Sequence, residues 1–249
     1  MYQDILTIAV VTVFAFFAIY WMWFQGEVDG SRLIAKNSMK QQKFNIILVL
    51  VAAFIVKAIL AVKNEGYSVD ITCFRSWSET VFTGGLSHFY EGDVTDYPPG
   101  YMLVLWLVAA IRHLFNIDNY STTGLFMIKL FPMLFDLAAA YLIYVMAKKR
   151  FSEGMSLMLS TLYALNPAVV IDSSVWGQVD GVLCCMVLLT CYLFMEEKRI
   201  LAYFAFCAGV LLKPQMVMFA PIIIYSIIEQ VFLHDFNTKK MLRDLIGGL

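Results

Sequence analysis

The sequence predicts an all-α fold, a polytopic bundle of about seven or eight membrane segments that forms a single transmembrane domain over residues 1–249. Three observations support this prediction. Of the 249 residues, 61% are hydrophobic and only 15% are charged, whereas soluble domains have nearer half and a quarter. Most of the apolar residues gather in runs of about the length that a bilayer requires. The Lys and Arg residues cluster in short turns between these runs.

The charge pattern and the cysteines exclude other classes of protein. The net charge is -1 and no basic face forms, so nucleic acid is not an expected partner. The five cysteines have no C-x-x-C spacing and no nearby pair of histidines, and we predict that they pack in the core and bind no metal. No glycine-rich phosphate loop follows a strand, which argues against a nucleotide-linked substrate, and no cofactor is expected.

The first two apolar runs set the orientation of the chain. Residues 5–24 have no basic stretch before them and no small-residue cleavage site after them, which predicts a membrane helix rather than a cleaved signal. The next loop carries four basic residues close to the membrane and is therefore predicted to be cytoplasmic. Residues 44–62 then lead to the outer face, with Lys57 near the far end either snorkelling or serving a site beyond.

An acidic, aromatic and glycine-containing segment follows, with the sequence VDITCFRSWSETVFTGGLSHFYEGDVTDYPPGY over residues 69–101. Within it, residues 64–100 are predicted to form an outer catalytic loop with short interfacial helices. Phe74 and Trp77 have helical spacing and are predicted to face lipid. Asp70 is a candidate general base that removes the proton of an attacking hydroxyl, or else a loop carboxylate solvated by water.

The remaining runs place two more polar turns on the same side as this loop. Residues 101–115 are short for a span and are predicted to form a re-entrant or interfacial helix. Residues 125–147 end in the basic residues 148–150, which predicts a cytoplasmic end. Two further pairs of spans then put the turns VWGQVDG and KPQ on the non-cytoplasmic face; these pairs are residues 155–170 with 182–195 and residues 201–212 with 216–231.

Polar side chains near the predicted outer face are the candidates for binding substrate. The motif DYPPGY has two prolines that fix the backbone and a glycine that permits close approach, and it is either a helix start or part of a site. Polar groups in VWGQVDG are costly at a membrane boundary unless they bind one another, water or a ligand. The predicted substrate-binding residues are Arg75, Asp96, Tyr97, Trp176, Gln178, Asp180, Lys213 and Gln215.

Two charged residues within apolar segments have open roles. Lys213, between two apolar runs, either snorkels or neutralises a phosphate. Asp136 lies inside a span and is predicted to pair with another polar group or to line a cavity. Lys129 is a poor partner for it by spacing.

These motifs together resemble the GT-C superfamily of membrane glycosyltransferases, most closely the mannosyltransferases of the glycosylphosphatidylinositol pathway and their bacterial relatives. The segments that carry the resemblance are VDITCFRSW, GGLSHFY, DYPPGY, KLFPMLFDLAAAYLIY, LNPAVVIDSSVWGQVDG and KPQ. They cover a core of about residues 44–232, so that residues 5–24 would be an extra N-terminal span. Members usually continue through further spans, and the chain is expected to be a fragment or minimal core of something longer.

The resemblance implies a role in glycan biosynthesis. A hexose such as mannose would move, with inversion, from a polyprenyl-phosphate donor to a lipid, glycan or protein acceptor on the non-cytoplasmic face of a bacterial plasma membrane or an endoplasmic reticulum membrane. Asp70 would be the general base, and Lys213 or Arg75 would neutralise the phosphate. Some relatives hold a divalent metal with acidic residues of this loop, and the residues here that could do so are Asp70, Glu91, Asp93 and Asp96.

Two alternatives from other classes remain. A transporter or flippase of a lipid-linked saccharide would also explain polar groups within the membrane. The absence of a visible inverted repeat and the gathering of polar residues on one face both argue against it. A non-catalytic subunit of a membrane complex is favoured by the short length.

Overall fold

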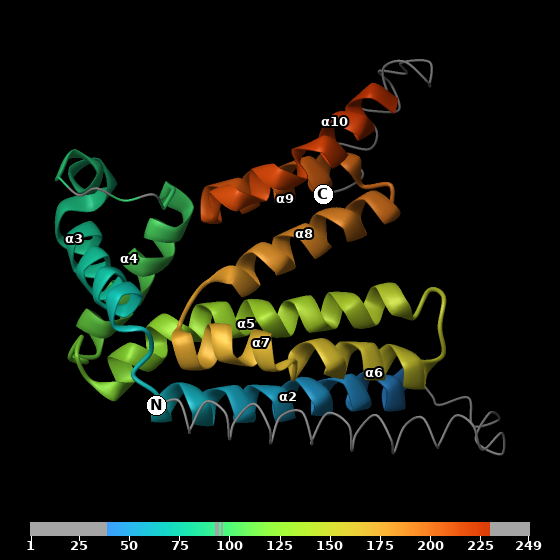
Figure 1. Cartoon of the computed structure of the whole chain (residues 1–249), viewed down its shortest axis with the longest axis horizontal. Coiled ribbons are helices and arrows are strands. Elements are labelled where there is room, and N and C mark those ends of the chain that lie inside the picture. The colour runs from blue at the N-terminus through green and yellow to red at the C-terminus, as the bar shows by residue number, and fades with distance from the viewer. Residues whose placement is uncertain (1–38, 93–94, 96, 230–249) are drawn as a thin grey trace.

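The computed structural model describes residues 39–92, 95 and 97–229, and in this part of the chain every regular element is a helix (Figure 1). The predicted span at residues 5–24 lies outside the described residues. The elements in chain order are α2 (Met39–Lys63), α3 (Ser68–Gly92), α4 (Pro99–Leu114), α5 (Thr122–Ala147), α6 (Glu153–Ala164), α7 (Pro167–Val170), the π-helix η2 (Ile171–Trp176), α8 (Asp180–Met195), α9 (Arg199–Leu212), the 3-10 helix η3 (Pro214–Phe219) and α10 (Ala220–Ile228).

Two of these helices are long and apolar enough to cross a membrane, namely Gln42–Lys63 of α2 and the whole of α5. A third candidate is α6 with the α7 and η2 segment, which is bent by 47°. The bend follows from the sequence Asn-Pro, because the Asn166 side chain caps the new helix at the amide of Ala168 and Pro167 starts its first turn. The other apolar helices are shorter, so the predicted number of seven or eight membrane segments is not confirmed.

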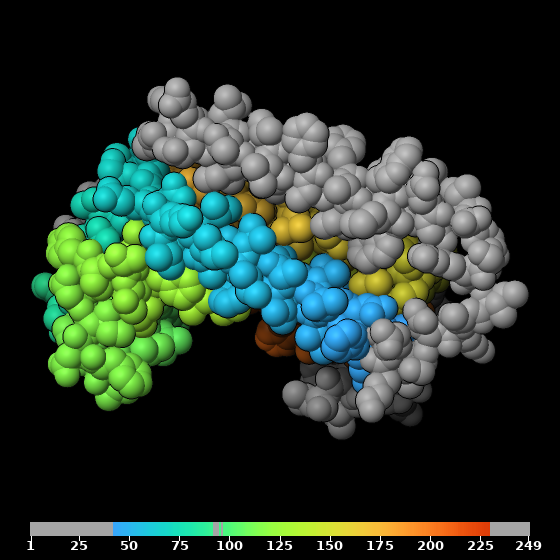
Figure 2. Space-filling model, turned by 90° about the horizontal axis from the view of Figure 1, so that it is seen from below, coloured from blue at the N-terminus to red at the C-terminus, as the bar shows by residue number. Residues whose placement is uncertain are grey.

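Helices α2, α5 and α6 lie side by side along the length of the molecule (Figure 1). Where they meet, Ala53, Ala140 and Ala164 are completely buried, and small residues of this kind let membrane helices approach closely. Figure 2 shows α2 along the surface of the molecule. Its outward side chains are apolar and exposed, as expected for a helix face that contacts lipid; examples are Ile47, Leu48, Val51, Ile55 and Ile59.

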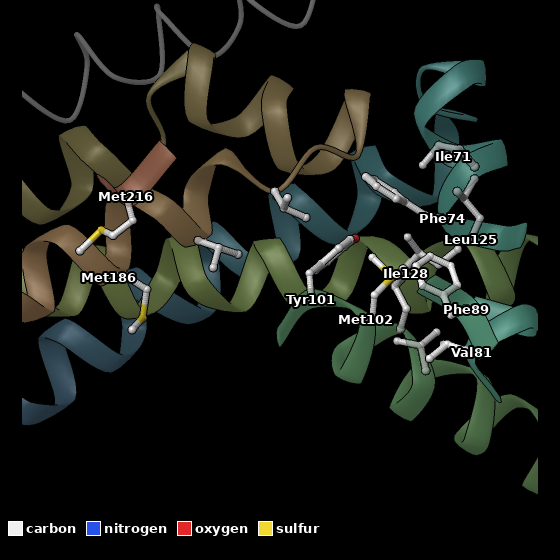
Figure 3. Close-up of a cluster of buried hydrophobic side chains, with 14 of the residues drawn as sticks. Ile71, Phe74, Val81, Phe89, Tyr101, Met102, Leu125, Ile128, Met186 and Met216 are labelled. Carbon is white, nitrogen blue, oxygen red and sulfur yellow. The ribbon is translucent and has the colours of Figure 1, made fainter. Parts of the chain in front are cut away.

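Helices α3 and α4 pack together at one end of this bundle and contain the acidic, aromatic segment. Helix α3 bends at Gly85, whose φ of 76° is a conformation that favours glycine. The chain then returns toward the start of α3, so that the Tyr97 ring lies 5.8 Å from the Phe74 ring and 5.6 Å from the Trp77 ring. This return buries the aromatic face of α3 in the main hydrophobic core (Figure 3).

The prediction that Phe74 and Trp77 face lipid is therefore wrong. Phe74 is only 1% exposed, and Trp77 is partly buried against the same core. The helical spacing of the two rings correctly placed them on one face of a helix. It could not show that the returning segment would cover that face.

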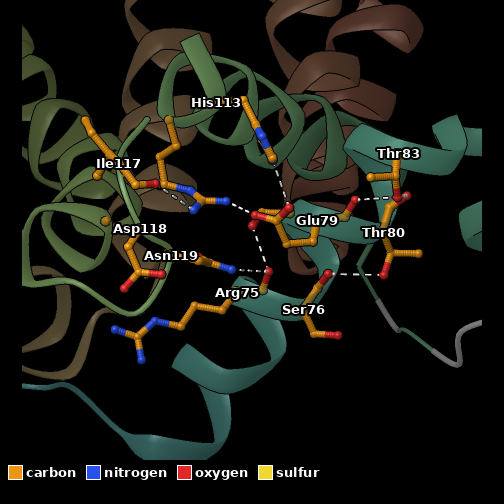
Figure 4. Close-up of polar contacts among 12 residues, drawn as sticks. Arg75, Ser76, Glu79, Thr80, Thr83, His113, Ile117, Asp118 and Asn119 are labelled. Atoms are coloured by element: carbon orange, nitrogen blue, oxygen red, sulfur yellow. Dashed lines mark hydrogen bonds and ion pairs between the residues drawn. The ribbon is translucent and has the colours of Figure 1, made fainter. Parts of the chain in front are cut away.

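A polar cluster joins the middle of α3 to the end of α4 (Figure 4). Glu79 forms an ion pair with the buried guanidinium of Arg112, and its other carboxylate oxygen lies 3.0 Å from Nε2 of His113. Beyond α4, the Asn119 side chain donates a hydrogen bond of 3.2 Å to the backbone oxygen of Arg75. These contacts fix α3 relative to α4 and α5, and thereby fix the position of Asp70 in the first turn of α3.

Candidate functional site

Asp70 is held by two side chains from a distant part of the sequence. Its Oδ2 atom accepts hydrogen bonds from Nε1 of Trp176 at 2.8 Å and from Nε2 of Gln178 at 2.9 Å. Within the described part of the chain, its Oδ1 atom accepts no hydrogen bond. The carboxylate is thus oriented through one of its two oxygens.

The π-helix η2 presents Trp176 and Gln178 to Asp70. It ends at Gly177, which has a left-handed φ of 91°, and the amides of Gly177 and Gln178 both donate to the backbone oxygen of Asp172 at 2.9 Å. A Cβ atom at position 177 would lie 2.8 Å from Cδ1 of Ile71. The left-handed backbone conformation therefore favours glycine in the WGQVD turn, and a larger residue would also have to displace the end of the Ile71 side chain. π-helical turns occur frequently at functional sites.

The start of α3 is attached to the same turn. The amide of Tyr67 donates a hydrogen bond of 2.9 Å to the backbone oxygen of Trp176, and the two rings lie 5.2 Å apart. Gly66 has a φ of 87°, and a Cβ atom there would come within 2.8 Å of the same oxygen. These contacts place Asp70, one turn later, opposite Trp176.

Tyr97 extends the hydrogen-bonded chain into the DYPPGY motif. Its hydroxyl donates to Oε1 of Gln178 at 3.2 Å, and Gln178 in turn donates to Asp70. The motif also approaches α9, because a Cβ atom at Gly100 would lie 2.5 Å from the backbone oxygen of Leu211. The predicted role of this glycine in close approach is confirmed.

Lys213 of the KPQ turn forms an ion pair with Asp180 of the WGQVDG turn. The lysine side chain is 7% exposed and the aspartate side chain 58%, so the pair lies at the edge of the protein. The structure therefore brings the outer loop and both polar turns to one end of the bundle, as the sequence predicts.

Three predicted site residues are not part of this arrangement in the described chain. Arg75 lies about 140° around α3 from Asp70, given 3.6 residues per turn, and its guanidinium packs over the Tyr120 ring at 5.2 Å. Gln215 is exposed in η3 and makes no hydrogen bond to any described residue. Asp96 lies outside the described residues.

The acidic residues do not form a metal site within the part of the chain that the structure describes. No group of three His, Cys, Asp or Glu side chains gathers there. Asp93 and Asp96 lie outside it, so a metal bound by this loop stays a prediction.

A buried polar cluster lies beneath the site and was only partly predicted. Nζ of Lys57 donates to Oδ2 of Asp136 at 2.8 Å, to Oγ of Ser173 at 3.1 Å and to the backbone oxygen of Val169 at 3.2 Å. Lys57 and Asp136 are both 0% exposed. Asp136 is paired, as predicted, but Lys57 neither snorkels nor reaches Asp70. The sequence indicated this pair only through two charged residues, Lys57 and Asp136, each of which lies within an apolar run.

Lys129 has a different role, on the other side of η2. It is completely buried, and its ammonium donates to the backbone oxygens of Asn64 at 2.7 Å, Ser174 at 3.0 Å and Val175 at 3.2 Å. Carbonyls at the ends of helices attract a cation. Lys129 therefore joins the end of α2 to the end of η2, and its predicted failure to pair with Asp136 is confirmed.

Gly181 is the point where the WGQVDG turn meets this buried cluster, and its replacement by Ala should destabilise the protein. The new Cβ atom would lie 2.0 Å from Oδ1 of Asp136, which has no hydrogen-bond partner among the described residues. Overpacking of this kind costs about 1–3 kcal/mol. Thermal unfolding in detergent, followed by circular dichroism, would measure the loss.

Gly209→Ala is the matched control for this prediction. A Cβ atom at position 209 would lie 3.0 Å from Cγ of Met216 and 3.1 Å from Cβ of Met186, which is a less severe contact than the one at position 181. We expect a smaller loss of stability there. Equal stability of Gly181→Ala and the wild type would contradict the close packing of α8 against Asp136.

Comparisons with known proteins add an independent observation. Residues 96–243 match a family model described as dolichyl-phosphate-mannose-protein mannosyltransferase. Over 128 residues the chain is 27% identical to GPI mannosyltransferase 1 of Saccharomyces cerevisiae, a similarity that covers 49% of this chain and 29% of that protein. The chain thus matches less than a third of the length of this curated relative. No solved structure matches it.

Proposed function

Because this chain belongs to the dolichyl-phosphate-mannose-protein mannosyltransferase family of the GT-C superfamily, we propose that it transfers mannose from a polyprenyl-phosphate donor to a lipid, glycan or protein acceptor. The similarity to GPI mannosyltransferase 1 supports mannose as the sugar. The observation that carries the proposal is the Asp70 carboxylate, which Trp176 and Gln178 orient at the end of a membrane helix bundle.

Asp70 acts as the general base of this reaction. Its Oδ1 atom takes the proton of the acceptor hydroxyl while the hydroxyl oxygen attacks C1 of the mannose. The bond between C1 and the phosphate oxygen breaks, and polyprenyl phosphate leaves with the electron pair. Attack opposite the leaving group inverts the configuration at C1. Hydrogen bonds from Trp176 and Gln178 to Oδ2 keep Asp70 aligned for this proton transfer.

Lys213 neutralises the phosphate of the donor. Its partner Asp180 follows Gln178 by two residues, so this ammonium belongs to the same turn region as the base. Asp180 is more than half exposed and can give up the ion pair when a phosphate arrives. A phosphate leaving group needs an opposing positive charge more than it needs a proton. Arg75, on another side of α3, is the weaker candidate.

The sugar lies against the exposed aromatic pair beside Asp70. Trp176 is 46% exposed and Tyr67 is 48% exposed, although their rings contact each other. A partly exposed aromatic ring offers an apolar face to the C–H groups of a sugar. Gln178 and Tyr97 supply polar groups at the edge of this surface.

Transfer takes place on the non-cytoplasmic face of the membrane. The basic turns at the end of α5 and before α9 lie together, because Lys149 forms an ion pair with Glu196. Both turns are at the far end of α5 from Lys129, which contacts the η2 segment that holds Asp70, and the 18 residues from Lys129 to Ala147 correspond to about 27 Å of helix. Basic turns favour the cytoplasm, which supports the opposite face for Asp70.

The donor class can be tested with the purified protein in liposomes, where no other enzyme converts one donor into another. We expect labelled mannose to pass to acceptors from a polyprenyl-phosphate donor and not from a nucleotide donor, because the proposed site is built for a lipid phosphate. Chromatography of the labelled products provides the measurement. Transfer from the nucleotide donor, or from neither donor, would contradict the proposal.

A further inference from the structure

Tyr101, the last residue of DYPPGY, has a buried hydroxyl that the packing of the protein does not explain. The side chain is 1% exposed, and its ring lies 5.3 Å from the Phe74 ring and 5.1 Å from the Tyr97 ring. Figure 3 shows the hydroxyl end of Tyr101 directed toward Phe74. Among the described residues, no group forms a hydrogen bond with this hydroxyl.

A phenylalanine would fill this position with the same ring contacts and no polar atom to bury. Leaving a buried hydroxyl without a partner is unfavourable, so such a group in a native protein needs an explanation. The surroundings suggest one, because Tyr97 and Phe74 are also neighbours of the Asp70 site. Phe74 follows Asp70 by one helical turn, and Tyr97 donates to the glutamine that holds Asp70.

The electrostatic surroundings keep this hydroxyl protonated. Burial raises the pKa of Tyr101 well above its ordinary value, and the nearby Tyr97 and Asp70 raise it further. Tyr101 is therefore a permanent hydrogen-bond donor within electrostatic range of the carboxylate that we assign as the base.

We propose that Tyr101 is a positioning residue of the Asp70 site, which donates its hydroxyl hydrogen to a water molecule bound between Tyr97 and Asp70. A buried water needs two to four polar partners, and these three side chains provide them. The water fixes the carboxylate in the direction of the acceptor hydroxyl and gives Tyr101 its missing partner. This inference rests on the proposed function of Asp70.

Tyr101→Phe tests the inference, because it removes only the hydroxyl. We expect kcat for mannosyl transfer to fall about tenfold, as for the loss of one hydrogen bond that positions the reacting carboxylate, while KM for the donor stays unchanged. The unfolding temperature should change little, since the hydroxyl bonds to a water molecule and not to another part of the fold. Activity that falls while stability holds is a combination that a purely structural tyrosine would not produce.

Tyr163→Phe is the control, because it also removes a buried tyrosine hydroxyl. It lies in α6, away from Asp70, and its variant should keep the wild-type kcat. An unchanged kcat in Tyr101→Phe, a clear fall in its unfolding temperature, or an equal loss of kcat in Tyr163→Phe would overturn the inference.

Asp70→Asn separates the inference about Tyr101 from the proposed function of Asp70. If Asp70→Asn abolishes transfer while Tyr101→Phe does not reduce it, only the inference about Tyr101 fails. Full transfer by Asp70→Asn would instead overturn the proposed function.

Discussion

Replacing Lys57 with Met is expected to lower the free energy of unfolding by about 3–5 kcal/mol, the usual effect of removing one partner of a buried ion pair. The loss is large because Asp136 is completely buried and would keep its charge, or take up a proton, without any cation beside it. Lys57 also bonds to Ser173 and Val169, so the start of the kinked segment before η2 would lose its attachment to α2. Chemical or thermal unfolding in detergent would measure the change.

The double variant Lys57→Met with Asp136→Leu is the control for this prediction. A buried pair replaced by apolar residues of similar shape is often as stable as the original. We therefore expect the double variant to recover most of the loss. A single Lys57→Met variant as stable as the wild type would contradict the role of this pair as a stabilising buried contact between α2 and α5.

The positions of the helices were predictable from the sequence, because apolar runs form the helices and the proline or charged residues between the runs end them. The Asn-Pro pair at residues 166–167 marks the end of α6, and the basic residues 148–150 follow the end of α5. For α3, the sequence did not predict whether the aromatic face of the helix contacts lipid or the protein core. Phe74 is buried because the returning segment with Tyr97 and Tyr101 packs over it, a tertiary contact that a helical spacing does not encode.

The candidate site was predictable in its location and less so in its contacts. Counting spans placed the outer loop, WGQVDG and KPQ together, and the pairs Asp70 with Gln178 and Lys213 with Asp180 agree with this. The hydrogen-bond partners of Asp70 depend on the left-handed conformation of Gly177 and on the π-helix before it. No local sequence pattern predicts a π-helix. Arg75 lies apart from Asp70 for a simpler reason, since proximity in sequence does not put it on the same helix face.

Asp70→Asn is expected to reduce mannosyl transfer by about 10²- to 10⁴-fold, the range that general base catalysis contributes. The substitution keeps the shape of the side chain. An amide oxygen can still accept the hydrogen bonds from Trp176 and Gln178, so the site should stay assembled. What is lost is the ability to take up a proton, because an amide is not a base near neutral pH.

The single-turnover rate of mannosyl transfer, measured over a range of donor concentrations, tests the role of Asp70 most directly. Glu65→Gln, in the exposed loop before α3, serves as the control and should behave like the wild type. We predict that Asp70→Asn loses at least about 100-fold in the rate at saturating donor, with an unchanged apparent affinity for the donor. A wild-type rate in Asp70→Asn, or a loss that is entirely in donor affinity, would contradict the assignment of Asp70 as the base.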